Sequence, residues 1–141
     1  MMHRIVKIKK IIEENEKVKT FLFDIDIDAE PGQFVMLWIP GMDEKPFSVS
    51  FLKPFGLTVA KVGKFTRVLH SMKEGTKVGI RGPYGNGFKV VGKKICIVGG
   101  GYGIIPLALL AEKANKNGVK VVSLIGAKTK NELLFVDRIK K

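Results

Sequence analysis

The pattern of apolar residues changes near residue 93, and this change limits the folds that the chain can adopt. Before it, short apolar or alternating runs are separated by turn signals such as Pro31-Gly32 and Pro40-Gly41. After it come an apolar run over 94–98, a glycine-rich turn and a helical pattern over 104–117. The first pattern is typical of a small antiparallel barrel, and the second predicts a strand–helix–strand unit with parallel strands.

The first part of the chain predicts six strands and one helix. The run over 34–39 contains no polar residue, which predicts a strand buried on both faces. The glycines and proline between residues 82 and 88 predict a structured loop. The expected strands are 5–12, 18–27, 34–39, 47–52, 57–62 and 76–80, and the expected helix is 65–73.

The second part predicts only the beginning of a nucleotide-binding fold. Strands over 94–98 and 119–125 flank the helix, and residues 131–140 indicate the start of another helix. One strand–helix–strand unit makes a thin sheet, so we expect this α/β domain to be incomplete. We place the barrel domain at residues 1–91 and the partial α/β domain at residues 92–141.

The charge pattern does not favour nucleic acid as a partner. The net charge is +12 and the pI is about 9.9, which would attract polyanions. The lysines are scattered singly, however, and the chain has no zinc-finger spacing, no aromatic RNA-stacking motif and no basic helix. We interpret the lysines as a solvated surface. The other interpretations are that the positive charge attracts phosphate-bearing cofactors or an acidic protein partner.

Cysteine and histidine are too scarce for a metal centre. Cys96 is the one cysteine, so neither a disulfide nor a cysteine-only iron–sulfur cluster can form within the chain, and we expect it to be buried in a strand. His3 and His70 lack metal-ligand spacing, which predicts no metal site. No apolar stretch reaches the ~18 residues of a membrane helix, and no signal-peptide pattern is present, so we expect a cytoplasmic protein.

The functional prediction depends on three short motifs. Gly99–Gly103 lies between a strand and a helix, where backbone amides can bind a pyrophosphate, although its spacing is not a regular G-x-G-x-x-G. Lys45-Pro46-Phe47-Ser48 opens a strand, and Gly63-Lys64-Phe65-Thr66 opens the helix of the barrel. Taken alone, each has a structural reading as a tight turn, a strand entry or a helix cap.

The order of these motifs, with Gly82-Pro83 between them, resembles the ferredoxin–NADP reductase superfamily over about residues 4–137. Within it, the likeness is strongest to the electron-transfer subunit of class B dihydroorotate dehydrogenase. That resemblance implies an FAD-binding barrel followed by an NAD(P)-binding α/β domain. It also implies that Ser48 lies near flavin N5 as the catalytic residue, and that Lys45 stands where family members usually have arginine.

The remaining site residues also follow from the resemblance. Val59 and Ala60 would meet the flavin, Gly63, Phe65 and Thr66 would hold its pyrophosphate, and Gly82 and Pro83 would lie beside the nicotinamide. The pyridine nucleotide would be bound by Gly99, Gly100, Gly101, Tyr102 and Gly103. Pro46 and Phe47 would line the isoalloxazine and ribityl chain.

The function implied is an oxidoreductase component that passes electrons from NAD(P)H through FAD to a catalytic dehydrogenase subunit in pyrimidine biosynthesis. The resemblance favours NAD as the coenzyme, whereas Lys128 and Lys130 could bind the 2′-phosphate of NADP. The [2Fe–2S] cluster of the family's electron-transfer subunits cannot form here because its cysteines are absent, and the α/β domain is expected to be truncated. The alternatives are a reductase component of a sulfide dehydrogenase, hydrogenase or ferredoxin-NAD(P) complex, and a non-redox binding module.

Overall fold

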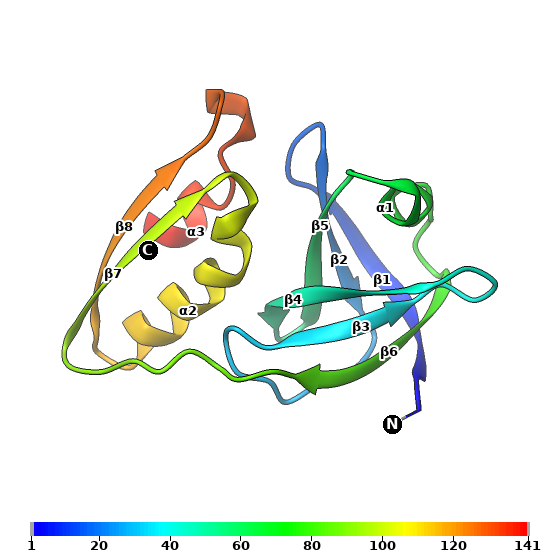
Figure 1. Cartoon of the computed structure of the whole chain (residues 1–141), viewed down its shortest axis with the longest axis horizontal. Helices are drawn as coiled ribbons and strands as arrows, with labels where there is room; N and C mark the ends of the chain where they lie inside the picture. Colours follow the sequence, from blue (N-terminus) through cyan, green and yellow to red (C-terminus); the bar gives the residue numbers. More distant parts are fainter. Residues whose placement is uncertain (1, 141) are drawn as a thin grey trace.

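A computed structural model describes residues 2–140, and its first part is a closed antiparallel barrel (Figure 1). The strands close the barrel in the order β1-β2-β5-β4-β3-β6, and the short helix α1 (Lys64–His70) follows β5. The predicted barrel with one helix is therefore confirmed. Its strands are β1 (Arg4–Glu13), β2 (Val18–Phe23), β3 (Phe34–Trp38), β4 (Glu44–Leu52), β5 (Phe55–Ala60) and β6 (Lys77–Tyr84).

The barrel is held together by an apolar interior that alternate residues of its strands supply. Phe21 and Phe23 of β2 and Phe55 of β5 are the largest of the fully buried side chains. Burying one such side chain contributes about 1.5–3 kcal/mol. The same interior holds Leu69 of α1, which fixes that helix across one end of the barrel.

Three details of the barrel differ from the sequence prediction. β3 is buried on one face only: Val35 and Leu37 are fully buried, and their neighbours are partly exposed, because a barrel strand turns its other face outward. β2 ends at Phe23, four residues early. β6 runs on through Gly82-Pro83 instead of entering a loop, because a register shift against β3 accommodates the two residues.

The second part is a strand–helix–strand unit, as predicted. β7 (Lys94–Gly100) and β8 (Lys120–Gly126) pair in parallel, and the turn η1 (Gly101–Gly103) leads into α2 (Ile104–Lys116). α2 lies between the two-stranded sheet and the barrel (Figure 1), and its Leu109 packs into the barrel interior. The expected C-terminal helix is a short turn η2 (Lys130–Glu132) and α3 (Val136–Lys140).

The sheet is covered on one face only, which corrects the expectation for its strands. Cys96 pairs with Val122 and Val98 pairs with Leu124, and these four residues are exposed, with Val98 69% and Leu124 59% accessible. The prediction that Cys96 is buried was therefore wrong. The apolar run is that of a strand with one helix packed against it, and the face opposite α2 is open.

Between residues 2 and 140, the helices are too short or too polar to cross a membrane. Within the same range, His, Cys, Asp and Glu side chains do not gather in groups of three that could hold a metal ion.

Candidate functional site

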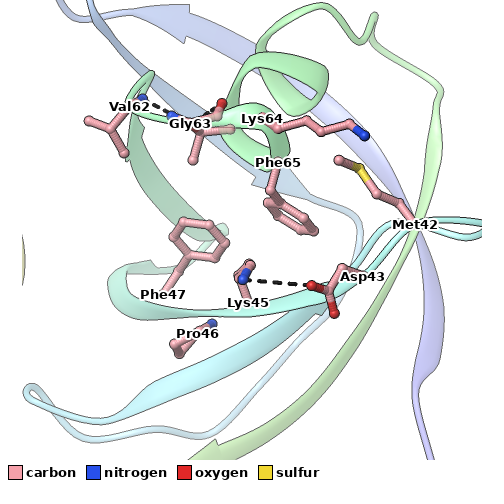
Figure 2. Close-up of a pocket in the computed structure, with 10 residues that line it drawn as sticks. Met42, Asp43, Lys45, Pro46, Phe47, Val62, Gly63, Lys64 and Phe65 are labelled. Atoms are coloured by element: carbon pink, nitrogen blue, oxygen red, sulfur yellow. Dashed lines mark hydrogen bonds and ion pairs between the residues drawn. The ribbon is translucent and has the colours of Figure 1, made fainter.

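A cavity of about 490 Å³ opens between β4 and α1 (Figure 2). Two stretches of chain that the sequence analysis singled out separately form its walls, and β4 and α1 bring them together. The lining residues are Met42, Asp43, Lys45, Pro46 and Phe47, before and at the start of β4, and Val62, Gly63, Lys64, Phe65 and Thr66, before and at the start of α1.

The floor of the cavity is aromatic. Phe47 of β4 and Phe65 of α1 point toward one another across it, with ring centroids 6.0 Å apart and planes inclined by 28° (Figure 2). Phe65 is only 6% exposed, so its ring is fixed by the barrel interior, whereas Phe47 is half-buried. The pair offers a flat apolar surface of the kind that a planar ring system can contact.

The start of α1 is shaped by a hydrogen-bonded cap. The Thr66 hydroxyl accepts hydrogen bonds from the Val62 and Gly63 N–H groups, both at 2.9 Å, and donates to the Gly63 carbonyl at 3.1 Å. Gly63 is extended, and a Cβ placed on it would meet no atom within 4 Å. The backbone is therefore held rigidly where the cavity leaves room beside it.

The polar part of the cavity is positively charged. Lys45 and Lys64 are exposed on its rim, and the Lys45 ammonium lies 3.6 Å from the Asp43 carboxylate (Figure 2). This exposed pair is a weak interaction that does not commit Lys45 to Asp43. The two lysines can therefore turn toward an anionic group in the cavity.

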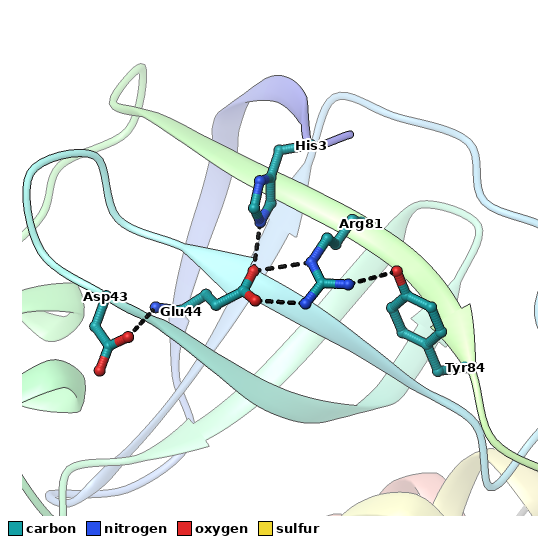
Figure 3. Close-up of polar contacts among 5 residues, drawn as sticks. All are labelled: His3, Asp43, Glu44, Arg81 and Tyr84. Carbon is teal, nitrogen blue, oxygen red and sulfur yellow. Dashed lines mark hydrogen bonds and ion pairs between the residues drawn. The ribbon is translucent and has the colours of Figure 1, made fainter. Parts of the chain in front are cut away.

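Next to the cavity, a charged network ties the start of β4 to β6 (Figure 3). The Arg81 guanidinium donates through Nε to Glu44 at 2.9 Å and through Nη2 to the other carboxylate oxygen, while Nη1 donates to the Tyr84 hydroxyl at 2.7 Å. His3 Nε2 lies 2.5 Å from Glu44, and its ring stacks on Trp38.

The network alters the protonation of its acid. The Arg81 hydrogen bonds, followed by that of His3, lower the pKa of Glu44 to about 2, and the Glu44 carboxylate in turn raises the pKa of Arg81. Glu44 precedes Lys45 directly in β4. The network therefore holds the strand that carries one wall of the cavity.

Several predicted site residues lie outside this cavity. Ser48 is half-buried one residue beyond Phe47, and the backbone of Val59 accepts a hydrogen bond from His70 Nε2 at 2.7 Å. Ala60 pairs with Val18 of β2 and packs against a second apolar cluster, which also contains Ile97 of β7 and Ile104 of α2. Gly82 and Pro83 lie in β6, separated from β4 by β3.

The predicted nucleotide-binding turn is exposed at the carboxyl end of the parallel sheet. Gly100, Gly101 and Gly103 are exposed, and a Cβ on any of them would meet no atom within 4 Å. Gly99 differs, because its Cβ would come within 2.9 Å of Ile104. Gly99 therefore permits α2 to pack on β7, while the other three leave the backbone of the turn accessible before α2.

Sequence reasoning missed three lining residues and the adjoining network. Met42, Asp43 and Val62 lie within three residues of the two predicted motifs, so extending each motif by that much would have found them. No local sequence pattern indicates the Arg81–Glu44 contact, because the two residues are 37 positions apart. They meet because β3 lies between β4 and β6 in the barrel.

The chain has close relatives of known description, although no family model matches it. It is 50% identical over 137 residues to the probable dihydroorotate dehydrogenase B (NAD(+)), electron transfer subunit of Methanocaldococcus jannaschii, covering 97% of this chain and 52% of that protein. The identity to the same subunit of Methanothermobacter thermautotrophicus is 49%, covering 96% and 53%. The chain thus spans about half the length of the curated relatives that it matches.

Solved structures share the fold over nearly the whole chain. The NADH-dependent reduced ferredoxin-NADP oxidoreductase, studied for electron bifurcation, superposes with a TM-score of 0.85 at 31% identity, covering 96% of this chain and 53% of that one. Phthalate dioxygenase reductase gives 0.83 at 17% identity, covering 99% and 48%, which shows the fold alone. The resemblance found in the sequence is confirmed: the chain is a homologue of dihydroorotate dehydrogenase B electron transfer subunits and has the fold of ferredoxin–NADP reductase-type proteins.

Proposed function

We propose that the chain binds FAD in the cavity between β4 and α1 and takes part in electron transfer from NAD(P)H to a dihydroorotate dehydrogenase. The observation that carries the proposal is the convergence of Lys45-Pro46-Phe47 and Gly63-Lys64-Phe65-Thr66 on one open cavity. The identity of about half of all residues to electron transfer subunits supports the same assignment.

The residues of the cavity suit the chemical parts of FAD. Its volume of about 490 Å³ lies within the roughly 300–1,000 Å³ of ordinary small-molecule sites. The Phe47–Phe65 pair would contact the isoalloxazine ring, and the rim lysines would balance the diphosphate charge. Bound FAD supplies two-electron and one-electron redox chemistry that no side chain of the protein offers.

The protein would act by holding the coenzyme in place. Gly63 leaves room for a phosphate beside the backbone, and Thr66 keeps that backbone in position through its cap. Lysine at position 45 supplies charge without the two-pronged geometry of arginine. Ser48 remains a proposed neighbour of flavin N5, which requires the ring to extend along β4 beyond Phe47.

The pyridine nucleotide would lie against the exposed turn before α2. Gly100, Gly101 and Gly103 leave the backbone open, and the first N–H groups of a helix favour a pyrophosphate. Tyr102, 43% exposed, stands in the same turn and could contact the nucleotide. We assign the barrel to residues 1–91 and this unit to residues 92–141 as the two parts of the proposed electron path.

The partner and the setting belong to the same proposal. We propose a catalytic dehydrogenase subunit as the electron acceptor, NAD as the natural donor and the cytoplasm as the location. We place no [2Fe–2S] cluster in this chain, because Cys96 is its one cysteine, and propose that the electrons pass from FAD to a carrier on the partner.

Absorbance spectroscopy tests the proposal directly. After incubation with FAD and gel filtration, the chain is expected to retain the near-ultraviolet and blue bands of bound flavin in about one-to-one ratio. Under anaerobic conditions NADH is expected to bleach them. Loss of all flavin at micromolar protein would contradict the FAD site and favour the binding-module alternative, whereas retained flavin that NADH leaves oxidised would contradict only the nucleotide site.

A further inference from the structure

Arg138 of α3 joins the barrel to the α/β unit. Its Nη2 donates to the Ser50 carbonyl of β4 at 2.6 Å, and its Nε donates to Glu112 of α2 at 2.6 Å. The guanidinium carbon lies 3.9 Å from the ring centroid of Phe51 and 4.9 Å from that of Phe135. One side chain therefore contacts β4, α2 and the segment before α3.

This contact is unusually buried for a charged group. The Arg138 side chain is 10% exposed, and its Nη1 is buried without a hydrogen-bond partner among residues 2–140. The two rings that enclose it meet edge to face, at 89° and 5.9 Å. A buried charge is an inefficient source of stability, because apolar replacements are often equally stable, but its directed bonds can fix one arrangement of the surrounding elements.

The packing around Arg138 is open on both sides. Cavities of about 250 Å³ and about 510 Å³ flank α3, and Arg138 and Glu112 line both. The ion pairs that do join the two parts, Lys17–Glu132 and Lys113–Glu30, are partly exposed and so weakly directing. Apolar contacts also join the two parts: Leu109 of α2 packs into the barrel interior, and Val18 of β2 lies in a second cluster with Ile97 and Ile104. Such contacts hold the two parts together but are not directional.

We propose that Arg138 is a positioning residue that fixes the orientation of the α/β unit on the barrel. The proposal rests on the proposed function in one respect: this orientation sets the separation between the FAD cavity and the nucleotide turn before α2. Arg138 touches neither site, and acts through β4, which carries Lys45 and Phe47, and α2, which begins at the turn.

Distance measurements between spin labels test the orientation without any coenzyme. One label is attached to Cys96, exposed on β7, and the other to Lys7→Cys, exposed on β1. In Arg138→Met the distance distribution is expected to become about twofold broader, since the apolar contacts that remain between the two parts are not directional. Arg138→Lys keeps the charge near Glu112 but not the planar fork, and is expected to restore the width only partly.

Arg4→Met is the matched control, because Arg4 is exposed at the far end of the barrel on β1. It is expected to leave the distribution unchanged. An unchanged width of the distance distribution in folded Arg138→Met would overturn the proposal. If Arg138→Met does not fold, the same result in Arg138→Lys would overturn it. A lower unfolding temperature with an unchanged width would show that Arg138 only stabilises the protein.

FAD titration of the same variants separates this proposal from the proposed function. The FAD dissociation constant is expected to stay within about twofold of the original, because no cavity residue is altered. If neither the original chain nor the variants bind FAD, the proposed function fails while the distance result still decides the role of Arg138.

Discussion

Phe47 and Phe65 face each other at 6.0 Å across the cavity, although one belongs to β4 and the other to α1. The pairing of β4 with β5, which α1 follows, brings the two rings together. Phe65 is anchored by its burial, while Phe47 remains half-buried and accessible to a ligand. The pair is therefore both a structural joint between strand and helix and the apolar surface of the proposed flavin site.

Replacing Phe65 by leucine separates these two roles. Leucine keeps an apolar side chain in the barrel interior but removes the flat ring, so we expect Phe65→Leu to weaken FAD binding about tenfold. The loss of stability should be about 1–2 kcal/mol. Fluorescence titration with FAD and urea unfolding measure the two effects.

Phe55→Leu is the matched control for that change. Phe55 is fully buried in the same interior and does not line the cavity. It should lose at least as much stability as Phe65→Leu while its FAD affinity stays unchanged. Parallel losses of affinity in both variants would mean that the flavin reports general loosening of the barrel.

Gly63→Ala tests the room left for a phosphate. Gly63 is extended and its added Cβ would meet no protein atom, so the fold should tolerate alanine at a cost of about 1 kcal/mol, through poorer capping of α1. The methyl group would occupy the space that the proposed diphosphate needs. We expect FAD affinity to fall about tenfold, a loss of about 1.4 kcal/mol.

Gly103→Ala gives the comparison for the other coenzyme. Its Cβ also meets nothing within 4 Å, but the residue lies in the turn before α2. FAD binding should be unaffected, and the concentration of NADH that half-maximally reduces the flavin should rise. The assignment of two separate sites would be wrong if the two glycine variants had the same effect on FAD.

The local motifs of the site could be predicted from the sequence because each is a continuous stretch. Lys45-Pro46-Phe47 begins a strand and Gly63–Thr66 begins a helix, and both geometries follow from neighbouring residues. That the two stretches share a cavity depends on the pairing of β4 with β5, which the sequence pattern did not specify. The Glu44–Arg81 contact depends on the position of β3 between β4 and β6, which no local sequence pattern indicates.

Burial was the least predictable property. The apolar run over 34–39 indicated a strand covered on two faces, and the run over 94–98 indicated a strand in which Cys96 is buried, yet each strand has an accessible face. In β3 the reason is the outward face of a barrel strand, where Met36 and Trp38 lie beside Arg81 and His3. In β7 the reason is a sheet with one packed helix, since hydrophobicity alone does not report how many layers surround a strand.

The Glu44 pKa predicts an acid-sensitive step in stability. Its folded pKa is about 2 against an ordinary value of 4.5, so the unfolded chain takes up the proton first. The stabilisation is complete above about pH 4.5 and is lost as the pH falls toward 2. In Arg81→Met the free energy of unfolding should depend less steeply on pH in this window, as urea titrations at several pH values would reveal.

Lys45→Met is the control for charge alone. It also removes one cation near the start of β4, but its exposed pairing with Asp43 is weak. The slope between pH 4.5 and 2 should remain that of the original protein. An identical slope in all three proteins would show that Glu44 is not the group responsible.

His70 predicts a second pH effect of its own. Burial lowers its pKa below the ordinary 6.5, and its Nε2–H donates to the Val59 carbonyl. Because the unfolded chain binds the proton more readily, stability is full above pH 6.5 and declines as the pH falls below it. His70→Gln keeps a donor without titrating, so the difference in unfolding free energy between the two proteins should shrink or reverse on acidification from pH 7.5 to 5.5. A constant difference would contradict the buried neutral histidine.

Cys96 provides a direct test of the open face of the sheet. It lies on the side of β7 opposite α2, next to Val122 of β8. Thiol reactivity is governed by exposure and by the thiolate fraction. One thiol per chain should therefore react with a chromogenic disulfide reagent under native conditions, at nearly the rate found in urea.

Val122→Arg, at the exposed neighbour of Cys96, should accelerate the reaction, because the arginine attracts the anionic reagent. Val121→Arg would instead place a charge under α2 and unfold the unit. Reaction that waits for unfolding would mean that this face is covered in solution, and it would contradict the two-layered arrangement of sheet and α2.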